Sequence, residues 1–333
     1  MKYKIVQKLK EEAPGYVSGG ELGKLFDVSR TAIWKYIEEL RSEGYSIEAV
    51  SGRGYRLLPA AERLNAYEIA CGLDTKLVGS KVLYFDSLDS TNNYARKIAA
   101  EGCDEGTAVV AARQTAGKGR LGRNWESPPD KGIYVSVVLR PPLAPAETPI
   151  ITLAAAVAVA DAIGDASGLS VGIKWPNDLV IDGRKVCGIL VEMGSEADRV
   201  NYVIIGIGIN YSQEVEDFPE GLRGRAISLK TACEEGGETC LPGRLTVIRS
   251  LLRRLDNVTQ LVLRYNNKEI IEMWKKRSVT LGRKVGFRLK DTDYTGTAVD
   301  VTEDGRLLVA CDDGVRRELL SGEVSVRGIY GYC

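Results

Sequence analysis

A cationic, glycine-rich stretch at residues 114–125 constrains this chain more than any other segment does. The runs on either side, residues 107–112 and 132–139, are rich in apolar and β-branched residues and predict strands. Glycine allows the backbone to approach a ligand closely, so that several N–H groups can converge on an anion. The stretch also carries three cations and a flat ring: Lys118, Arg120, Arg123 and Trp125. It therefore predicts a loop that holds an anionic, partly planar ligand such as a nucleotide.

Residues 117–122, Gly-Lys-Gly-Arg-Leu-Gly, also match the G-x-G-x-x-G pattern of dinucleotide-binding proteins. That pattern requires a helix beginning at the third glycine and an acidic residue about 20 positions later. Here residues 127–132, Ser-Pro-Pro-Asp-Lys-Gly, come after the pattern and cannot continue a helix. A Walker loop is excluded as well, because no Gly-Lys-Ser/Thr ends the run. The remaining alternative is that the stretch is a solvated surface loop. The motifs further along the chain disfavour this alternative.

Length and charge limit the classes of protein that the chain can belong to. Its 333 residues predict two domains or three small ones, and 44% hydrophobic residues are ample for a core. The net charge is zero, so any contact with nucleic acid must come from a local patch. We find no signal peptide, and the most apolar run, residues 150–162, is too short to span a bilayer. A cytoplasmic protein without membrane contact is expected.

The inventory of reactive side chains is also restrictive. The chain has no histidine, which excludes Ser-His-Asp and Cys-His catalysis and imidazole-bound metals. Its seven cysteines are scattered and contain no CxxC pair, so they indicate reduced thiols and neither a disulfide framework nor a zinc site. Any chemistry must rest on lysine, arginine, carboxylates, hydroxyls and backbone amides.

Residues 1–62 predict a helix-turn-helix module with a wing. Its last predicted helix, residues 30–40, has one apolar stripe, and Ser29 is placed to cap it. A strand pair around residues 51–54 predicts the wing, and residues 59–62 predict a linker. Side chains off the apolar stripe and on the wing are expected to contact DNA: Ser29, Arg30, Thr31, Trp34, Lys35, Arg53 and Arg56. The alternative is a winged module that mediates only protein contacts.

Polar motifs interrupt the strands and helices predicted after residue 63. Residues 89–92, Asp-Ser-Thr-Asn, precede a predicted helix, where free N–H groups suit a small polar ligand or a carboxylate. The alternative is that these residues simply cap the helix. Residues 202–210 predict a buried strand whose glycines leave room for a ligand or a close neighbour.

Two further motifs bring charge to the same region. Residues 171–178 predict a strand that runs into a polar turn, where Asp178 could hold Mg²⁺ on a polyphosphate. The pair Asp182-Gly183 is a strong hairpin signal. We therefore expect Lys174 and Lys185 to lie on neighbouring strands.

The ordered set of motifs resembles the biotin protein ligase family. The matching segments are DSTN at 89–92, GKGRLGRNW at 117–125, KWPND at 174–178, DGRKVCGILVE at 182–192 and IGIGIN at 205–210. With the predicted winged helix, the chain resembles the bifunctional branch, in which one protein is both the ligase and the repressor of the biotin operon. Each motif alone is weak, whereas the ordered set is specific and spans nearly the whole chain.

The expected fold is α+β with three domains. Residues 1–62 would form the winged helix-turn-helix, and residues 63–279 a mixed-sheet catalytic domain of the biotin/lipoate-ligase type. Short strands separated by Asp-Gly turns predict a small SH3-like β-barrel over residues 280–333.

The resemblance also implies roles for single residues. Residues implied to contact biotin are Ser90, Thr91, Asn92, Gln114, Lys118, Gly119, Arg120, Lys185 and Gly206. Residues implied to contact ATP or the adenylate are Arg123, Trp125, Lys174, Asn177, Asp178 and Asn210. Lys185, Arg120 and Lys118 are the implied catalytic cations, and Asp178 is the implied Mg²⁺ ligand. The family commonly has an arginine where this chain has Lys118, so the charge is kept but the two-pronged guanidinium is lost.

The family joins biotin to ATP to give biotinyl-5′-AMP, and then transfers biotin to a carrier-protein lysine. ATP and biotin would be substrates, assisted by Mg²⁺, with no permanently bound cofactor. Expected partners are the biotin carboxyl carrier protein of acetyl-CoA carboxylase or a related carboxylase, operator DNA, and a second copy in a ligand-dependent homodimer. The alternatives are a lipoate–protein ligase, which the winged helix and the KWPND motif disfavour, and a biotin-sensing regulator without catalysis.

Overall fold

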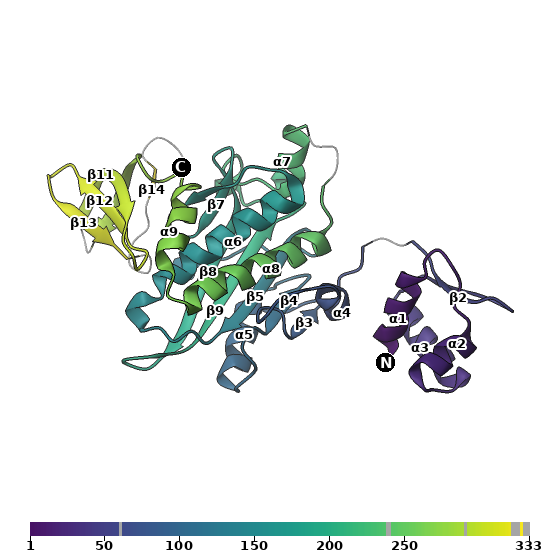
Figure 1. Cartoon of the computed structure of the whole chain (residues 1–333). Coiled ribbons are helices and arrows are strands. Elements are labelled where there is room, and N and C mark those ends of the chain that lie inside the picture. The colour runs from purple at the N-terminus through teal and green to yellow at the C-terminus, as the bar shows by residue number, and fades with distance from the viewer. Residues whose placement is uncertain (60–61, 238–240, 290–291, 321–326, 329–333) are drawn as a thin grey trace. The chain divides into compact units, whose positions relative to one another are not determined.

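The computed structural model describes residues 1–59, 62–237, 241–289, 292–320 and 327–328 (Figure 1). The chain divides into two compact units, Met1–Arg63 and Leu64–Cys333. Part of the linker expected over residues 59–62, namely residues 60–61, lies outside the described residues.

The first unit is a helix-turn-helix with a two-stranded wing, as predicted. It contains α1 (Lys2–Glu11), α2 (Gly19–Phe26), α3 (Arg30–Ser42), β1 (Ile47–Val50) and β2 (Gly54–Leu57). The hydroxyls of Ser18 and Ser29 accept hydrogen bonds from the backbone N–H groups of Glu21 and Ala32, which caps α2 and α3. The apolar stripe of α3 is fully buried and comprises Ile33, Ile37 and Leu40.

The second unit is built on a seven-stranded mixed sheet. Its strands are β3 (Val82–Phe85), β4 (Ala108–Ala111), β5 (Gly132–Leu139), β6 (Gly172–Lys174), β7 (Asp178–Ile181), β8 (Arg184–Ser195) and β9 (Val200–Asn210). The order across the sheet is β3-β4-β5-β9-β8-β7-β6, and only the β3–β4 pair among these strands is parallel. This order corrects one prediction. Lys174 and Lys185 are not on neighbouring strands, because residues 175–177 form a tight turn and β7 pairs between β6 and β8.

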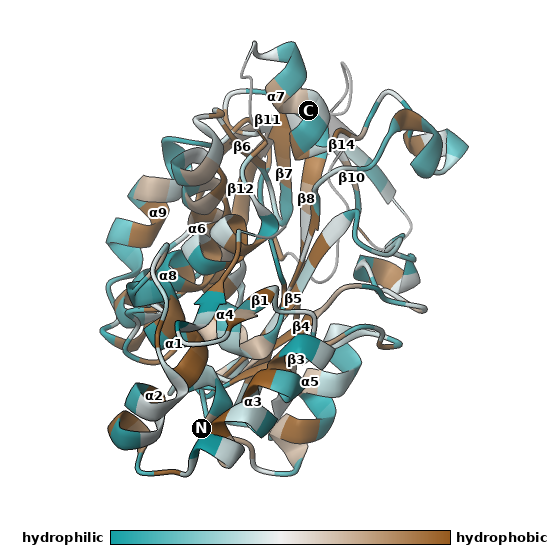
Figure 2. Ribbon diagram, turned by 90° about the vertical axis from the view of Figure 1, so that its right-hand side faces the viewer, coloured by the Kyte–Doolittle hydropathy of each residue, from teal (hydrophilic) through white to brown (hydrophobic). Residues whose placement is uncertain are grey.

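Helices cover both faces of this sheet. On one face α6 (Pro149–Ser167), α8 (Arg244–Leu263) and α9 (Asn267–Lys275) pack over apolar side chains such as Val135 and Ile205 (Figure 1). On the other face α5 (Thr91–Ala100) packs over Val138 and Ile204. Successive strand residues point to opposite faces. Strands that are covered on both faces are therefore apolar along their length, and β7 is largely brown in Figure 2. The remaining α-helices of the unit are α4 (Ala66–Ala70) and α7 (Leu229–Glu235).

Helix α6 corrects the expectation that no apolar segment reaches membrane-spanning length. Together with the turn before it, residues Pro145–Ser167, it is long and apolar enough to cross a bilayer, with a mean hydropathy of 1.6. However, 72% of its most apolar window is buried inside the protein, against α8 and the sheet. A helix that is apolar all round and covered by other elements is a core helix.

The chain ends in a five-stranded antiparallel sheet. Its strands are β10 (Lys284–Leu289), β11 (Thr292–Val301), β12 (Leu307–Cys311), β13 (Arg316–Leu319) and β14 (Arg327–Gly328), in the order β13-β12-β11-β10-β14. Its apolar side chains, including Val285, Phe287 and Leu307, belong to the same buried cluster as those of the larger sheet. The short C-terminal strands predicted from the sequence are thus confirmed, and the SH3-like barrel class stays a prediction.

The cysteines that the structure describes are free thiols. They are Cys71, Cys103, Cys187, Cys233 and Cys311. Cys240 and Cys333 lie outside the described residues.

Candidate active site

Two adjoining cavities lie where the loop at residues 114–125 meets strands β8 and β9. The larger has a volume of about 860 Å³ and the smaller about 50 Å³. The residues that line both are Gly119, Arg120, Trp125, Asn177 and Lys185. The two cavities therefore form one composite site, and the residues predicted from separate motifs come together in it.

The smaller cavity is built on the start of α5. Ser90 is only 1% exposed, and its side chain makes no cap hydrogen bond, which argues against the simple capping alternative. The backbone N–H and the hydroxyl of Thr91 both contact Gln114 Oε1, at 2.8 and 3.1 Å. Gln114 Nε2 in turn donates to Ser127 Oγ at 3.0 Å. These bonds tie both ends of the glycine-rich loop to the helix start.

Asn92 lies at the floor of this cavity and is held on two sides. Its Nδ2 donates to Glu192 Oε2 at 2.7 Å, and the Ser136 hydroxyl donates to its Oδ1 at 2.6 Å. A Cβ at Gly206 would collide with Asn92 Oδ1, so this position of β9 requires glycine. Ser136 and Glu192 were not predicted from the sequence. Ser136 had a usable signal, since it is the one polar residue in the apolar strand β5.

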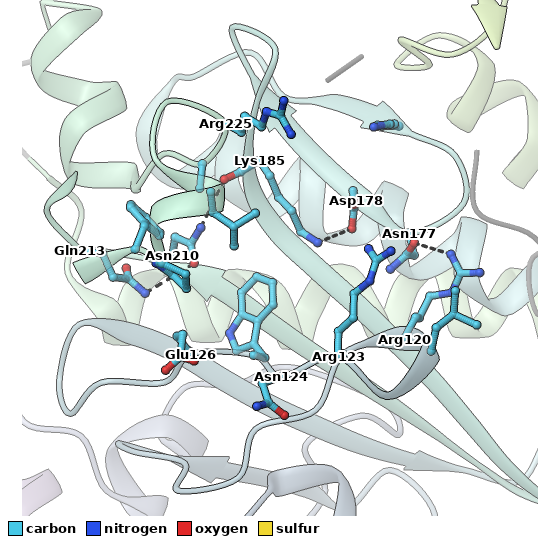
Figure 3. A pocket seen from close by; sticks show the side chains of 18 of the residues that line it. Arg120, Arg123, Asn124, Glu126, Asn177, Asp178, Lys185, Asn210, Gln213 and Arg225 are labelled. Atoms are coloured by element: carbon cyan, nitrogen blue, oxygen red, sulfur yellow. Dashed lines mark hydrogen bonds and ion pairs between the residues drawn. The ribbon is translucent and has the colours of Figure 1, made fainter. Parts of the chain in front are cut away.

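Charged groups face the larger cavity (Figure 3). Lys185 Nζ lies 2.6 Å from Asp178 Oδ1 on the adjacent strand β7, and 5.2 Å from the centre of the Trp125 ring. Lys174 lines the same cavity from β6. The cavity thus combines lysines, a carboxylate and an indole, as the sequence analysis expected for a nucleotide site.

The Trp125 ring lies over a pair of glycines. Gly188 and Gly208 are opposite each other in the β8–β9 ladder. A Cβ at Gly188 would approach the indole to 2.8 Å, and one at Gly208 to 2.6 Å. Only strands without side chains at these two positions allow the ring to lie so close to the sheet.

The arginines of the loop enter the site from its open side. Arg120 Nη1 donates to Asn177 Oδ1 at 2.8 Å, and Asn177 Nδ2 donates to the Ile189 carbonyl at 2.9 Å. Burial lowers the pKa of the Arg120 guanidinium, whereas the nearby Asp178 acts in the opposite direction. Figure 3 shows Arg123 pointing toward the same groups. Lys118, in contrast, is exposed and donates to Asn93 Oδ1 at 2.6 Å, so it lies at the mouth of the smaller cavity.

Residues 211–228 form a wall of the larger cavity that the sequence analysis did not predict. Its backbone pairs with β8, because Lys185 N donates to Arg225 O at 2.8 Å and Ile227 N donates to Lys185 O at 2.9 Å. The lining residues from this wall are Gln213, Asp217, Phe218, Pro219, Leu222, Arg225 and Ala226. Asn124 and Glu126 of the loop also line the cavity.

Asn210 sits where this wall leaves β9. Its Nδ2 donates to the carbonyls of Lys185 and Ile227 at 3.2 and 3.3 Å. Its Oδ1 lies 3.5 Å from Gln213 Nε2, and Gln213 is only 2% exposed. Buried amides therefore occupy one end of the larger cavity, away from Arg120 and Arg123 (Figure 3).

The residues predicted to contact DNA are gathered on α3 and the wing of the first unit. Those that are exposed are Ser29, Arg30, Thr31, Trp34, Lys35 and Arg53. Three of the predicted side chains are engaged within the fold, including Arg53, which lies 5.6 Å from the Tyr16 ring centre. Ser29 caps α3, and Arg56 forms an ion pair of 2.6 Å with Glu48 and lies 4.7 Å from the Tyr16 ring centre.

Comparison with known proteins agrees with this arrangement. Family models match in three places: a helix-turn-helix domain at residues 2–56, the biotin/lipoate A/B protein ligase family at 84–210, and the biotin protein ligase C-terminal domain at 280–327. The bifunctional ligase/repressor BirA of Bacillus subtilis is 38% identical over 313 residues, which cover 94% of this chain and 95% of that protein. The chain belongs to the biotin protein ligase family.

Other members of the biotin protein ligase family agree with this assignment. The bifunctional ligase/repressor BirA of Escherichia coli is 32% identical over 93% of this chain and 92% of that protein. The solved biotin protein ligase from Aquifex aeolicus in complex with biotin and ATP is 30% identical, with a TM-score of 0.62, over 75% of this chain and 99% of that chain. The family, the fold class and the ligase/repressor class expected from the sequence are confirmed.

Proposed function

We propose that this chain condenses biotin with ATP to biotinyl-5′-AMP and then transfers the biotinyl group to a lysine of a carrier protein. One observation carries the proposal: a small amide-lined cavity and a large cationic cavity share Lys185, Arg120 and Trp125. We assign the ureido ring of biotin to the smaller cavity, where Ser90, Thr91, Asn92 and Gln114 offer polar atoms. ATP fits the larger cavity. The biotin carboxylate and the α-phosphate then meet at the shared wall.

The first step forms a bond between a biotin carboxylate oxygen and the α-phosphorus, while the bond to the pyrophosphate leaving group breaks. Two anions must approach each other, so cations at the shared wall lower the barrier. We assign this role to Lys185 and Arg120. Gly119 and Lys118 belong to the loop that covers biotin, and Lys118 acts from the mouth of the smaller cavity.

The nucleotide is expected to lie with its ring on Trp125 and its phosphates toward the cations. Trp125 offers a flat face above the Gly188–Gly208 pair, next to the amides of Asn210 and Gln213. Arg123, Lys174, Asn177 and Asp178 are the residues that we assign to the phosphate side. The sequence analysis placed Asn210 there as well, and the position of its amide favours the base or the ribose.

Mg²⁺ fits this site as an ion carried by the nucleotide. Among the described residues, no group of three or more carboxylates or thiols could hold a metal ion by itself. Mg²⁺ commonly takes one or two carboxylates and completes its shell with phosphate oxygens and water. Asp178 would supply the carboxylate, and the ion would supply charge that offsets the phosphates.

In the second step the nitrogen of a neutral lysine amine bonds to the biotinyl carbonyl carbon, the bond from that carbon to the phosphate oxygen breaks, and AMP and a proton are released. We propose the biotin carboxyl carrier protein of acetyl-CoA carboxylase, or a related carboxylase, as the acceptor. Lys118 and Arg123 are exposed beside the site, so the loop is open to a protein substrate.

We assign the regulatory activity to the first unit. The winged helix-turn-helix would bind a two-fold symmetric operator, with a homodimer presenting two α3 helices to two half-sites. Biotinyl-5′-AMP would favour the dimer, in keeping with a cytoplasmic repressor that senses biotin supply. The proposed functional limits are residues 1–62 for DNA binding, 63–279 for catalysis and 280–333 for the C-terminal domain.

Exchange of pyrophosphate into ATP tests the adenylation step and both alternatives. We expect exchange that depends on biotin and is absent with lipoate. Exchange with lipoate alone would support a lipoate–protein ligase. No exchange with either acid would support a regulator without catalysis.

A further inference from the structure

Strand β6 joins the catalytic sheet to the chain segment that leads into the C-terminal sheet. It is the edge strand of the seven-stranded order, with β7 on its inner side. On its outer side it pairs with residues 277–279, since Ile173 N donates to Arg277 O at 2.8 Å and Val279 N donates to Ile173 O at 3.0 Å. The strand that precedes the KWPND turn is therefore bounded on both sides.

Trp175, directly after β6, is held by the C-terminal region through two hydrogen bonds. Its backbone N–H donates to Thr280 Oγ1 at 2.9 Å, and its indole Nε1–H donates to the Gly305 carbonyl at 3.3 Å. Trp175 is 1% exposed and Thr280 is 4% exposed. Water cannot readily replace either bond, so loss of one leaves a buried polar group without its partner.

The turn that contains Gly305 is itself fixed. Gly305 has a φ of +88°, which favours glycine, and a Cβ there would lie 3.1 Å from Ile150 N in α6. The Glu303 carbonyl accepts from Asn267 Nδ2 at 3.3 Å, and Lys275 Nζ lies 2.8 Å from Asp300 Oδ1. The β11–β12 turn is thus docked on α6 and α9 and acts as a rigid support.

The two bonds matter because Trp175 and the three residues after it, Pro176, Asn177 and Asp178, all line the larger cavity. Asn177 accepts the hydrogen bond of Arg120, and Asp178 forms the ion pair with Lys185. A shift of the Trp175 backbone must move both residues. We propose that Thr280 and the β11–β12 turn position Asn177 and Asp178 for the nucleotide. This inference rests on the proposed ATP-binding role of the larger cavity.

The proposal predicts a selective effect on ATP. Lys174 and Asp178 line the larger cavity but not the smaller one, whereas the smaller cavity is formed mainly by α5, the loop, β8 and β9, with Asn177 as its one residue from residues 174–178. Loss of a hydrogen bond of Trp175 is therefore expected to weaken the binding of ATP and to leave the binding of biotin nearly unchanged. A residue that only stabilised the fold would change both substrates or neither.

Steady-state adenylation by the full chain, with ATP and biotin varied in turn, tests this split. Thr280→Val keeps the side-chain shape but removes the acceptor for Trp175 N–H, and Thr280→Ser restores it. The matched control is Thr295→Val, which removes a side-chain hydrogen bond to Asp312 in the same sheet, away from Trp175. We expect Thr280→Val to raise the KM for ATP by about fivefold or more and the KM for biotin by less than about twofold. Thr280→Ser and Thr295→Val should resemble wild type.

A second variant keeps the test decisive if Thr280→Val does not fold. Trp175→Phe removes the indole N–H donor while retaining a large ring, and it should give the same split between the two substrates. Equal changes in both KM values, or none in either, would overturn the positioning role while wild-type adenylation stands. Absence of biotin-dependent adenylation in the wild type would instead overturn the proposed function.

Discussion

Asp178 holds Lys185 inside the larger cavity, with 2.6 Å between Oδ1 and Nζ across the β7–β8 strand pair. Their side chains are 20% and 21% exposed, so the pair is partly shielded from water. A lysine held in this way needs little ordering when an anion arrives, and the carboxylate that holds it is available for a nucleotide-bound cation. The pair therefore joins the lysine that would meet the anionic substrates to the carboxylate that would meet the nucleotide-bound cation.

Replacement of Lys185 by alanine is expected to nearly abolish formation of biotinyl-5′-AMP. Loss of a charged partner in a partly dry site commonly costs about 2–4 kcal/mol in transition-state stabilisation, and Asp178 would also lose its counter-charge. Single-turnover adenylation with radiolabelled ATP measures the effect. Lys284→Ala, which removes a lysine paired with Asp312 in the C-terminal sheet, is the matched control. Adenylation by the Lys185 variant within about threefold of wild type would remove Lys185 from this role.

Alanine substitutions at two glycines of β9 are expected to affect the binding of the two substrates differently. Gly206→Ala places a methyl group against Asn92 and is expected to weaken biotin binding by about tenfold or more, with a smaller effect on ATP. Gly208→Ala places the methyl group 2.6 Å from the Trp125 indole and should weaken ATP more than biotin. Calorimetric titration of each variant with each ligand gives four affinities. A pattern in which both variants weaken the same ligand would contradict the assignment of the two cavities.

Arg120→Gly is expected to release the adenylate faster while changing the affinity for free biotin less. The arginine bonds to Asn177 at the shared wall, and its charge would act chiefly on the adenylate phosphate. Glycine also adds backbone freedom to the loop. The dissociation rate of biotinyl-5′-AMP and the labelling of unrelated lysines are the measurements. An unchanged rate together with strict labelling of the acceptor would exclude this role for Arg120.

Ligand occupancy and DNA binding should be linked through the dimer. The loop at 114–125 carries cations that repel one another when no anion is bound, so the adenylate is expected to order it and to favour association of two chains. Sedimentation with and without a non-hydrolysable adenylate analogue measures the association. In the same state Lys35→Ala should weaken DNA binding across sequences and reduce its salt dependence, as loss of a phosphate contact does. An unchanged monomer–dimer equilibrium would contradict ligand-gated repression and leave the ligase proposal intact.

The sequence was most informative where residues of one site are close together in the chain. The loop with Arg120 and Trp125, the hairpin at Asp182-Gly183 and the capped helix α3 each carry a local signal. For such features glycine, charge and apolar periodicity reflect the local backbone directly.

The features that the sequence did not reveal depend on pairing between distant segments. The wall at residues 211–228 pairs with β8 through hydrogen bonds to Lys185, about 40 positions away, which no local periodicity encodes. The contacts of Asn92 with Ser136 and Glu192, and of Trp175 with Gly305, join residues 44 to 130 positions apart. Such partners can be recognised only once the sheet order is known.

The central claim is that this chain makes and transfers an activated biotin, and mass spectrometry of a biotin carrier domain tests it most directly. The purified domain is incubated with the full chain, biotin, ATP and Mg²⁺, and its intact mass is followed with time. Matched reactions omit ATP, replace biotin by lipoate, or use the Lys185→Ala variant. We predict a mass increase of one biotinyl group on a single lysine, which depends on ATP and biotin and is nearly lost in the variant. An unmodified carrier domain in the complete reaction, or the same modification without ATP, would contradict the account.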